Sequence, residues 1–305
     1  MSILVVGSVA YDTVETPSGR AERVLGGSAS FFAVAASYFA PVNLVGVVGD
    51  DFGEQQLAAF RGRPIDLAGL ERAAGKTFHW QGRYSQDLNS RDTIRTDLNV
   101  FEFFQPKIPA AYRRSELVFL GNIDPVLQRE VLAQVEKPRV VACDTMNYWI
   151  KGKPEELRET LSKVDVLLIN DQEARELSGE WNLVKAARAI RAMGPQTLVV
   201  KKGEHGVLMF GEQGAFSAPA YPLEEVFDPT GAGDTFAGGL LGYLASVQGA
   251  GALDEAALRR AVVMGSTLAS FCVEAFSLDR LLRLTRPEID RRFELFRQLT
   301  HFDPA

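Results

Sequence analysis

Residues 227–244 read FDPTGAGDTFAGGLLGYL and join a glycine turn to an acid. Gly231, Ala232 and Gly233 allow a ligand to approach the backbone closely, and the apolar residues that follow have helical spacing. The start of a helix offers unpaired amide donors and the positive end of the helix dipole, which together bind an anion such as phosphate. Asp234 falls in the same first turn, where a carboxylate can take the proton of an attacking hydroxyl. The pattern indicates phosphoryl transfer, although a plain glycine turn before a helix would look the same.

The elements that would position this turn alternate along the chain. Continuous apolar runs, typical of buried parallel strands, lie at 3–6, 43–47, 117–120, 139–142, 166–169 and 197–200. Helical patterns lie at 28–39, 53–60, 125–134, 154–161, 171–177 and 183–192. Two short strands (206–210 and 214–218) and three long helices (232–247, 255–273 and 287–299) follow. Strand and helix in alternation predict a layered α/β sheet with right-handed crossovers.

Two segments, about 10–24 and 76–101, break this alternation. The second contains two strands of period two, with Phe78, Trp80 and Tyr84 on one face of the first strand. One face of the next strand is lined by Arg91, Thr93, Arg95, Asp97 and Asn99. Together the two segments predict a small sheet that stands off the main sheet and serves as a lid, with Asn99 as a substrate contact. A hairpin that decorates one edge of the main sheet is the alternative.

The composition limits the class of protein. The chain has 305 residues, 46% of them hydrophobic, which is enough for a sizeable α/β core. A formal net charge of −6 offers no basic surface for nucleic acid or anionic lipid, so small polar molecules are the expected partners. Without a signal-peptide pattern or a membrane-spanning run, we expect a cytoplasmic protein. Cys143 and Cys272 lie in apolar runs and are expected to be buried thiols.

The stretch DPTGAGDTFAGGLL resembles the C-terminal signature of the ribokinase-like (PfkB) carbohydrate kinases. The resemblance covers nearly the whole chain, because other family motifs occur in the family's order: Gly26-Gly27, GVVGDDFG at 46–53, Asn170 with Glu173, and Gly203 with Gly206. It implies a single domain over 1–305, built as a three-layer Rossmann-like sheet with a small β-lid. It also implies Mg2+ and ATP as cofactors, Asp234 as the general base, and Gly231, Ala232 and Gly233 as the anion hole.

Acceptor-side residues follow the first strand. By the resemblance Asp12 binds acceptor hydroxyls, and a carboxylate suits two vicinal hydroxyls well. Gly26 and Gly27 precede a helix and would let a polar ligand meet the backbone. Many relatives carry an asparagine four places after this pair, whereas this chain has Phe31. An aromatic side chain offers a flat apolar wall, so either the acceptor carries a ring or the helix is shifted.

Nucleotide-side residues occupy strand ends and the last helices. Asn170 and Glu173 form a capping-box pattern, and the resemblance adds a role in organising water around Mg2+, with Glu173 as the metal contact. Lys201 stands where a threonine is more usual, and either contacts a phosphate or is solvated at a strand end. The predicted ATP contacts also include Gly203, Gly206, Thr230, Ser266 and Thr267. Some relatives hold a monovalent cation near the last of these, and the sequence leaves that open.

A second departure from the family occurs at Asp144-Thr145-Met146-Asn147, where relatives often show Asp-Pro-Asn. The asparagine falls one place later, which makes Asn147 a further candidate for the site.

Three kinds of protein stay open from the sequence. The first is an ATP-dependent kinase that phosphorylates the hydroxymethyl group of a ribonucleoside or free sugar, or a phosphosugar kinase if Arg83, Arg91 and Arg95 clamp a substrate phosphate. The aromatic residues of the lid favour a nucleoside. The second is a kinase for a vitamin-like heterocyclic alcohol, which has no vicinal hydroxyls for Asp12. The third is a non-catalytic ligand sensor. Apolar lid strands also predict a homodimer through the lid.

Overall fold

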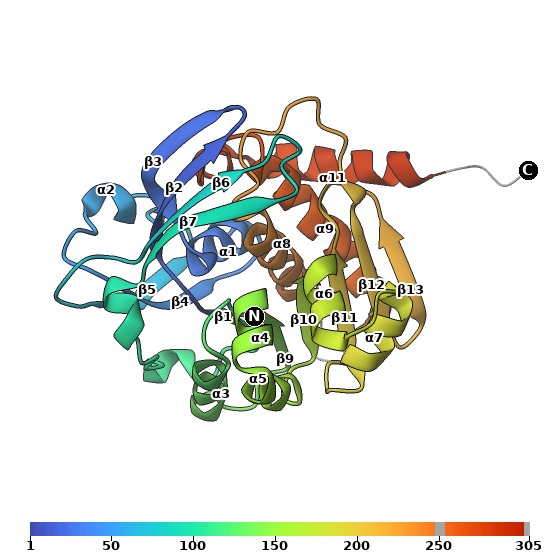
Figure 1. The fold of residues 1–305 in the computed structure, drawn as a ribbon, viewed down its shortest axis with the longest axis horizontal. Helices are drawn as coiled ribbons and strands as arrows, with labels where there is room; N and C mark the ends of the chain where they lie inside the picture. Colours follow the sequence, from blue (N-terminus) through green and yellow to red (C-terminus); the bar gives the residue numbers. More distant parts are fainter. Residues whose placement is uncertain (248–253, 302–305) are drawn as a thin grey trace, which may run out of the picture.

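A large mixed sheet forms the centre of the computed structural model, which describes residues 1–247 and 254–301 (Figure 1). Its strands are β1 (Ile3–Val6), β4 (Val42–Val48), β5 (Ile65–Arg72), β8 (Leu117–Leu120), β9 (Val140–Asp144), β10 (Val166–Asn170), β11 (Thr197–Lys201), β12 (Val207–Gly211) and β13 (Gly214–Ala218). In the described residues the order is β13-β12-β11-β10-β9-β8-β1-β4-β5. Among the described strands, antiparallel pairing occurs at one edge, where β12 pairs with both β11 and β13. The carboxyl ends of the parallel strands therefore share one side of the sheet.

Helices cover both faces of this sheet and complete a three-layer architecture. One layer contains α1 (Ser28–Ala36), α8 (Ala232–Val247), α9 (Glu255–Cys272), α10 (Asp279–Arg283) and α11 (Arg286–Thr300). The other contains α3 (Pro125–Gln134), α4 (Asn147–Gly152), α5 (Pro154–Leu161), α6 (Asp171–Ser178) and α7 (Leu183–Arg191). The short helix α2 (Glu54–Leu57) follows β4. Three 3-10 turns, η1 (Asn99–Phe103), η2 (Ala110–Tyr112) and η3 (Gly203–His205), lie in connections of the described chain.

The two layers enclose two separate hydrophobic cores. Ile3 and Val5 of β1 belong to the core under α1 and α8, while Leu4 and Val6 belong to the core under α3 and α5. Successive side chains of a strand point to opposite faces, which is why this strand is apolar at every position. No helix among residues 1–247 and 254–301 is long and apolar enough to cross a bilayer.

Each core also contains one cysteine, and both are buried free thiols as predicted. Cys143 belongs to the core under α3 and α5, and Cys272 to the core under α1 and α8.

The predicted lid is confirmed as a second sheet of four strands in the order β3-β2-β6-β7. These strands are β2 (Ala10–Thr16), β3 (Gly19–Gly26), β6 (His79–Tyr84) and β7 (Arg91–Asp97). Two antiparallel hairpins join through a parallel pairing of β2 with β6. In Figure 1 this lid lies above α1 and α8, and a hydrogen bond from Thr230, just before α8, to Tyr84 of β6 joins the two regions.

Three details of the lid and its surroundings differ from the sequence prediction. A register shift between Gln81 and Gly82 divides the face predicted for β7, because Arg91 and Thr93 lie opposite Tyr84 and Gly82 whereas Arg95 lies opposite Gln81. Arg95 and Asp97 therefore belong to the outer face, whereas Thr96 lies opposite Trp80 on the inner face.

Asn99 is not in the strand at all. It begins the turn η1 in a left-handed backbone conformation with φ 52°. The edge strand β5 was also missed, because its partly exposed IDLAGLER sequence lacks the continuous apolar run of its neighbours.

Candidate active site

The glycine turn before α8 is held open by its own hydrogen bonds and by an aromatic ring. Asp228 accepts the Thr230 amide proton on Oδ1 at 2.8 Å. Gly231 has a φ of 75°, and a Cβ atom there would come within 2.4 Å of the Phe31 ring. Only glycine fits, both because of the left-handed backbone and because the ring occupies the space. Phe31 is 1% exposed, so the aromatic wall predicted for the acceptor lies beneath the anion loop.

The amides of this turn begin the helix. The Ala232 amide donates to the Pro229 carbonyl at 3.2 Å, and the Thr235 amide donates to the Gly231 carbonyl at 2.8 Å. The Ala232 bond is long, so this amide can be shared with an incoming oxygen at small cost.

Asp234 stands in the first turn of α8, half-buried beside the anion loop. Burial, followed by the negative charge of Asp144, raises the pKa of Asp234 to about 7, although the positive charges of Lys201 and Arg91 oppose this shift. A carboxylate with a pKa near the working pH is suited to general-base catalysis, because it can both accept and release a proton.

Lys201 lies inside the site and is not solvated at a strand end. Its Nζ atom lies 3.4 Å from Asp144 Oδ2, and its side chain is only 18% exposed. A Cβ atom at Gly233 would come within 2.9 Å of the same Nζ atom, so the ammonium group adjoins the anion loop. Burial lowers the pKa of Lys201, but the surrounding carboxylates outweigh this and raise it overall, so the lysine stays charged. Of the two sequence interpretations, the structure supports a phosphate contact in position and charge.

Asp144 is a further candidate residue of this site, which the sequence motifs did not single out. It ends β9, is buried, and accepts the Thr145 amide proton at 2.7 Å. Asn147, chosen instead because of the departure from Asp-Pro-Asn, is exposed at the start of α4. The signal was available, because Asp144, Asn170 and Lys201 each end one of three adjacent parallel strands, and such ends meet at one edge of the sheet.

The predicted capping box at the start of α6 is present. The Glu173 amide donates to Asn170 Oδ1 at 2.8 Å, and the Asn170 amide donates to Glu173 Oε2 at 2.8 Å. Burial, followed by the negative charge of Asp144, raises the pKa of Glu173 to about 7, although the positive charge of Lys201 opposes this shift. In the described residues no three His, Cys, Asp or Glu side chains group closely enough to hold a metal directly. A role for Glu173 through water fits this spacing.

Asp12 faces the same cluster from the lid. It is 6% exposed, and a Cβ atom at Gly26 would come within 1.9 Å of Asp12 Oδ2. Gly27 has a φ of 93°, and its amide hydrogen bonds to the Asp12 carboxylate. The glycine pair thus makes room for the carboxylate. Burial, followed by the negative charges of Asp228 and Asp234, raises the pKa of Asp12 to about 7. Asp12 therefore lies within electrostatic range of the predicted base.

The inner face of the lid adds Tyr84, Arg91 and Trp80, which the sequence offered as lid residues that could contact the acceptor. Thr230 Oγ1 donates to the Tyr84 hydroxyl at 3.2 Å. The Arg91 guanidinium hydrogen bonds to Tyr84, lies 5.6 Å from the Trp80 ring centre, and is within electrostatic range of Asp234 and Glu173. The arginine is exposed, so solvent weakens these interactions even though protein atoms surround the guanidinium.

Only Arg91 of the three lid arginines faces the site. Arg83 pairs with Glu15 at 3.0 Å, and Arg95 pairs with Asp97 at 2.8 Å on the outer face. A clamp of three arginines is therefore wrong.

The other residues predicted to contact ATP lie next to backbone atoms, the lid or helix α9. Gly206 has a φ of 79°, and a Cβ atom there would meet the Ala218 carbonyl oxygen at 2.2 Å. Gly203 adjoins Asn89 in the lid hairpin turn. Thr267 is fully buried and its hydroxyl donates to the Val263 carbonyl at 2.9 Å, while Ser266 is half-buried. Their contacts with a nucleotide stay predictions.

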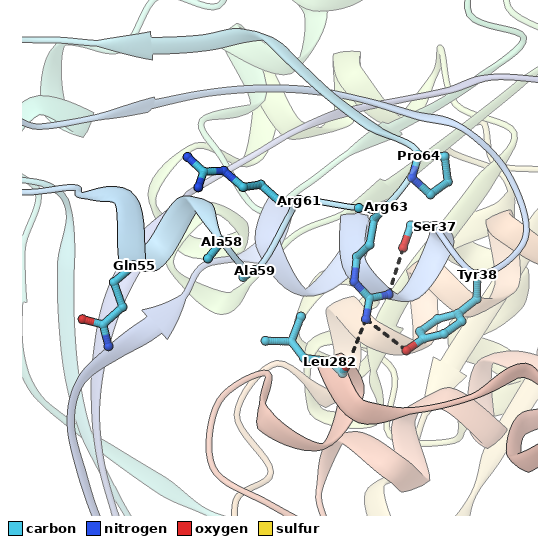
Figure 2. A pocket seen from close by; sticks show the side chains of 10 residues that line it. Ser37, Tyr38, Gln55, Ala58, Ala59, Arg61, Arg63, Pro64 and Leu282 are labelled. Atoms are coloured by element: carbon cyan, nitrogen blue, oxygen red, sulfur yellow. Dashed lines mark hydrogen bonds between the residues drawn. The ribbon is translucent and has the colours of Figure 1, made fainter.

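A separate surface hollow of about 620 Å³ lies at the other end of α1 (Figure 2). Phe31 lies under the anion loop and Ser37 follows the end of this helix, so the two residues are about 9 Å apart along the helix axis. Arg63 donates there to Ser37, Tyr38 and the carbonyls of Leu281 and Leu282. Its donors are occupied by the fold, and the hollow has no part in the chemistry described above.

Comparisons with known proteins identify the family of the chain. Residues 1–282 match the model of the pfkB family carbohydrate kinases. A cytidine kinase from Thermococcus kodakarensis is 33% identical over 251 residues, 80% of this chain and 88% of that protein.

Two solved structures share the fold. A Burkholderia thailandensis nucleoside kinase in complex with inosine has a TM-score of 0.77 at 22% identity, covering 96% of this chain and 98% of that one. A putative ribokinase II from E. coli in complex with ATP and Mg2+ has a TM-score of 0.77 at 17% identity, covering 98% and 99%.

The chain belongs to the pfkB family of carbohydrate kinases. It is a phosphotransferase with an alcohol group as acceptor, and it carries out the ATP-dependent phosphorylation of a sugar or nucleoside. The non-catalytic sensor is thereby set aside.

Proposed function

We propose that this kinase phosphorylates the hydroxymethyl group of a ribonucleoside. The observation that carries the proposal is the position of Asp12, a buried carboxylate on the inner side of the lid, within electrostatic range of Asp234. Such a carboxylate can accept hydrogen bonds from two vicinal ribose hydroxyls. Trp80 on the same face offers a ring against which a base can stack, and the 33% identity to a cytidine kinase supports the same class of acceptor.

Asp234 is the general base in this proposal. Its half-buried carboxylate accepts the proton of the acceptor hydroxyl, whose oxygen then attacks the γ-phosphorus as the bond to the ADP oxygen breaks. The amides of Ala232, Gly233 and Asp234 donate to the phosphoryl oxygens, assisted by the N-terminal end of α8. Lys201 places a positive charge beside the same oxygens. Closure of the lid excludes water that would otherwise hydrolyse ATP.

The residues present suit Mg2+ and ATP as cofactors. A Cβ atom at Gly233 would come within 2.9 Å of Lys201 Nζ, so glycine at this position keeps the ammonium group beside the anion loop. Glu173 would hold Mg2+ through water beside Asn170, and the bound ion would neutralise charge on the phosphates. Gly203, Gly206, Thr230, Ser266 and Thr267 complete the proposed ATP contacts.

Several further expectations stay predictions. They are a single kinase domain over 1–305, a monovalent cation near the end of α9, a homodimer through the lid, and a cytoplasmic location.

An anionic sugar is the second candidate acceptor, because Arg91 puts a cation on the inner face of the lid. Arg83 and Arg95 do not contribute, since Glu15 and Asp97 occupy them.

A screen of ADP release with Mg-ATP decides between these classes, using ribonucleosides, pentoses, hexoses and their phosphates as acceptors. We expect release to depend on a ribonucleoside. Strong turnover of a sugar phosphate with no turnover of any nucleoside would contradict the proposal.

Asp12→Asn separates vicinal-diol acceptors from the vitamin-like heterocyclic alcohols. An asparagine still accepts one hydrogen bond but loses the charge, so we expect kcat/KM for the nucleoside to fall about tenfold to a hundredfold, the scale of charge-assisted hydrogen bonds. An unchanged kcat/KM would instead support an acceptor without vicinal hydroxyls.

A further inference from the structure

Where the lid joins the main body, three of its segments contact a single acid of the GVVGDDFG segment. Asp51 lies in the connection between β4 and α2 on the main body. Its Oδ1 atom accepts from the Thr77 amide at 2.7 Å and from the Thr77 hydroxyl at 2.6 Å. Its Oδ2 atom accepts from Arg23 Nη2 at 3.0 Å. Its backbone carbonyl accepts from the Tyr11 hydroxyl at 2.9 Å. One residue of the body thus contacts β2, β3 and the entrance to β6.

Thr77 extends this contact to the other end of the second lid hairpin. It is 1% exposed, its hydroxyl accepts from the Gly49 amide at 3.0 Å, and its carbonyl accepts from Asn99 Nδ2 at 2.9 Å. Asn99 comes just after β7, so the entrance and the exit of the hairpin meet at Thr77. This contact also gives Asn99 a role at the root of the lid, in place of the predicted strand position.

The first hairpin is held in the same way. Arg23 has a left-handed backbone with φ 48°, and its guanidinium lies 4.5 Å from the Tyr11 ring centre. Tyr11 also packs against Phe52, with ring centres 6.0 Å apart. We call Asp51, Thr77 and Arg23 the lid anchor.

We propose that Asp51 is a positioning residue for phosphoryl transfer, because the lid anchor sets the lid so that its inner face lies over Asp234. The residues that depend on this setting are Asp12 on β2, Tyr84 on β6 and Arg91 on β7. None of them contacts Asp51, so the effect passes through the rigid strands. Loss of the lid anchor should weaken acceptor binding and allow water to reach ATP, while the chemistry on the body stays intact.

The pair Asp50 and Asp51 offers a matched control. An asparagine at 51 has one oxygen for two groups of donors, so its amide NH2 must face either Thr77 or Arg23. Asp50 is exposed, and its Oδ2 atom accepts one hydrogen bond within the described residues, from the Gly75 amide at 3.0 Å. Asparagine can keep that single bond. Asp51→Asn and Asp50→Asn thus make the same chemical change with different expected results.

Hydrogen exchange in the ligand-free protein tests the lid anchor without any acceptor. We expect Asp51→Asn to speed amide exchange about tenfold in β2, β6 and β7, the scale of a lost charge-assisted hydrogen bond, and to leave β10 unchanged. Asp50→Asn should match the wild type throughout. Equal rates for the two variants, or equal acceleration in the lid and in β10, would overturn the proposal.

Kinetics with Mg-ATP and cytidine form the second arm, which rests on the proposed nucleoside acceptor. Asp51→Asn should raise KM for cytidine about tenfold and raise acceptor-free ADP release relative to transfer, with kcat changed less. A fall in kcat with KM and acceptor-free release unchanged would argue against a positioning role. If the wild type does not use cytidine, the choice of acceptor is wrong and the exchange result alone decides on the lid anchor.

Two variants at Thr77 keep the test decisive should Asp51→Asn fail to fold. Thr77→Val removes the hydroxyl at nearly constant shape, and Thr77→Ser retains it. Faster lid exchange in Thr77→Val with restored protection in Thr77→Ser supports the proposal. Wild-type exchange in both variants would refute it.

Discussion

The catalytic edge of the main sheet and the lid both carry charged residues, but they use charge in different ways. At the sheet edge, Lys201 and Asp144 form a pair with side chains 18% and 11% exposed, and their charges shift the pKa of Asp234 and Glu173. On the lid, Arg83 and Glu15 pair with side chains 59% and 39% exposed. Solvent screens the second pair and not the first. Chemistry therefore depends on the body, and the lid contributes through the few side chains that face inward.

The sharpest test of this contrast is Asp234→Asn. Asparagine cannot accept the acceptor proton, so turnover should fall at least about a hundredfold, the usual scale for loss of a general base, while ATP binding is kept. Steady-state turnover and calorimetric titration with ATP measure the two effects. Retained turnover would mean that Asp234 is not the base.

A second test separates the charge of Lys201 from its volume. The Lys201 charge lowers the pKa of Asp234, so Lys201→Met should raise that pKa and move the rising limb of the kcat/KM profile to higher pH. In the wild type, we expect this limb near pH 7, because burial raises the Asp234 pKa to about that value. At pH 6.5 the variant should turn over about tenfold more slowly, the effect of one unit in pKa.

Lys201→Arg is the control. It keeps the positive charge, so the rising limb of its kcat/KM profile should stay at the wild-type pH. If the rising limb of the kcat/KM profile of Lys201→Met stayed at the wild-type pH, the Lys201 charge would not control the pKa of Asp234.

The smallest effects should come from the lid arginines. Arg91→Gln removes the cation on the inner face and should lower kcat/KM about fivefold, consistent with an exposed but charge-assisted contact. Arg83→Gln removes a cation that pairs with the exposed Glu15, and should change kcat/KM less than twofold. Equal losses in the two variants would remove the distinction between inner and outer faces of the lid.

Much of the fold could be predicted because parallel strands and their helices leave clear apolar periods. The bounds of β1, α3, α5, β13 and α8 are those expected from the sequence. The edge strand β5 could not be found in this way, since one of its sides is open to solvent and its apolar positions are interrupted. The register shift beside Gly82 was also hidden, because a bulge has no strong sequence period.

The candidate site was predictable where a motif carries the chemistry, and less so where contacts come from distant segments. Asp234 and the glycine turn stand together in one stretch. Tyr84 and Thr230 are 146 residues apart and meet only when the lid folds over α8. Asp144 was not predicted, because the departure from Asp-Pro-Asn directed the prediction to Asn147. The end of its strand was nevertheless located to within two residues. Phe31 was identified, but its position under Gly231 depends on how α1 packs.

The reactivity of the two cysteines can be used to measure how the helical layers separate from the central sheet. Cys143 and Cys272 lie in different cores, on opposite faces of the central sheet, and burial raises the pKa of both thiols. Neither will react with an alkylating reagent while its own layer is closed. The relative labelling rates of the two therefore distinguish separation of one helical layer from cooperative unfolding of both, with no probe added to the chain.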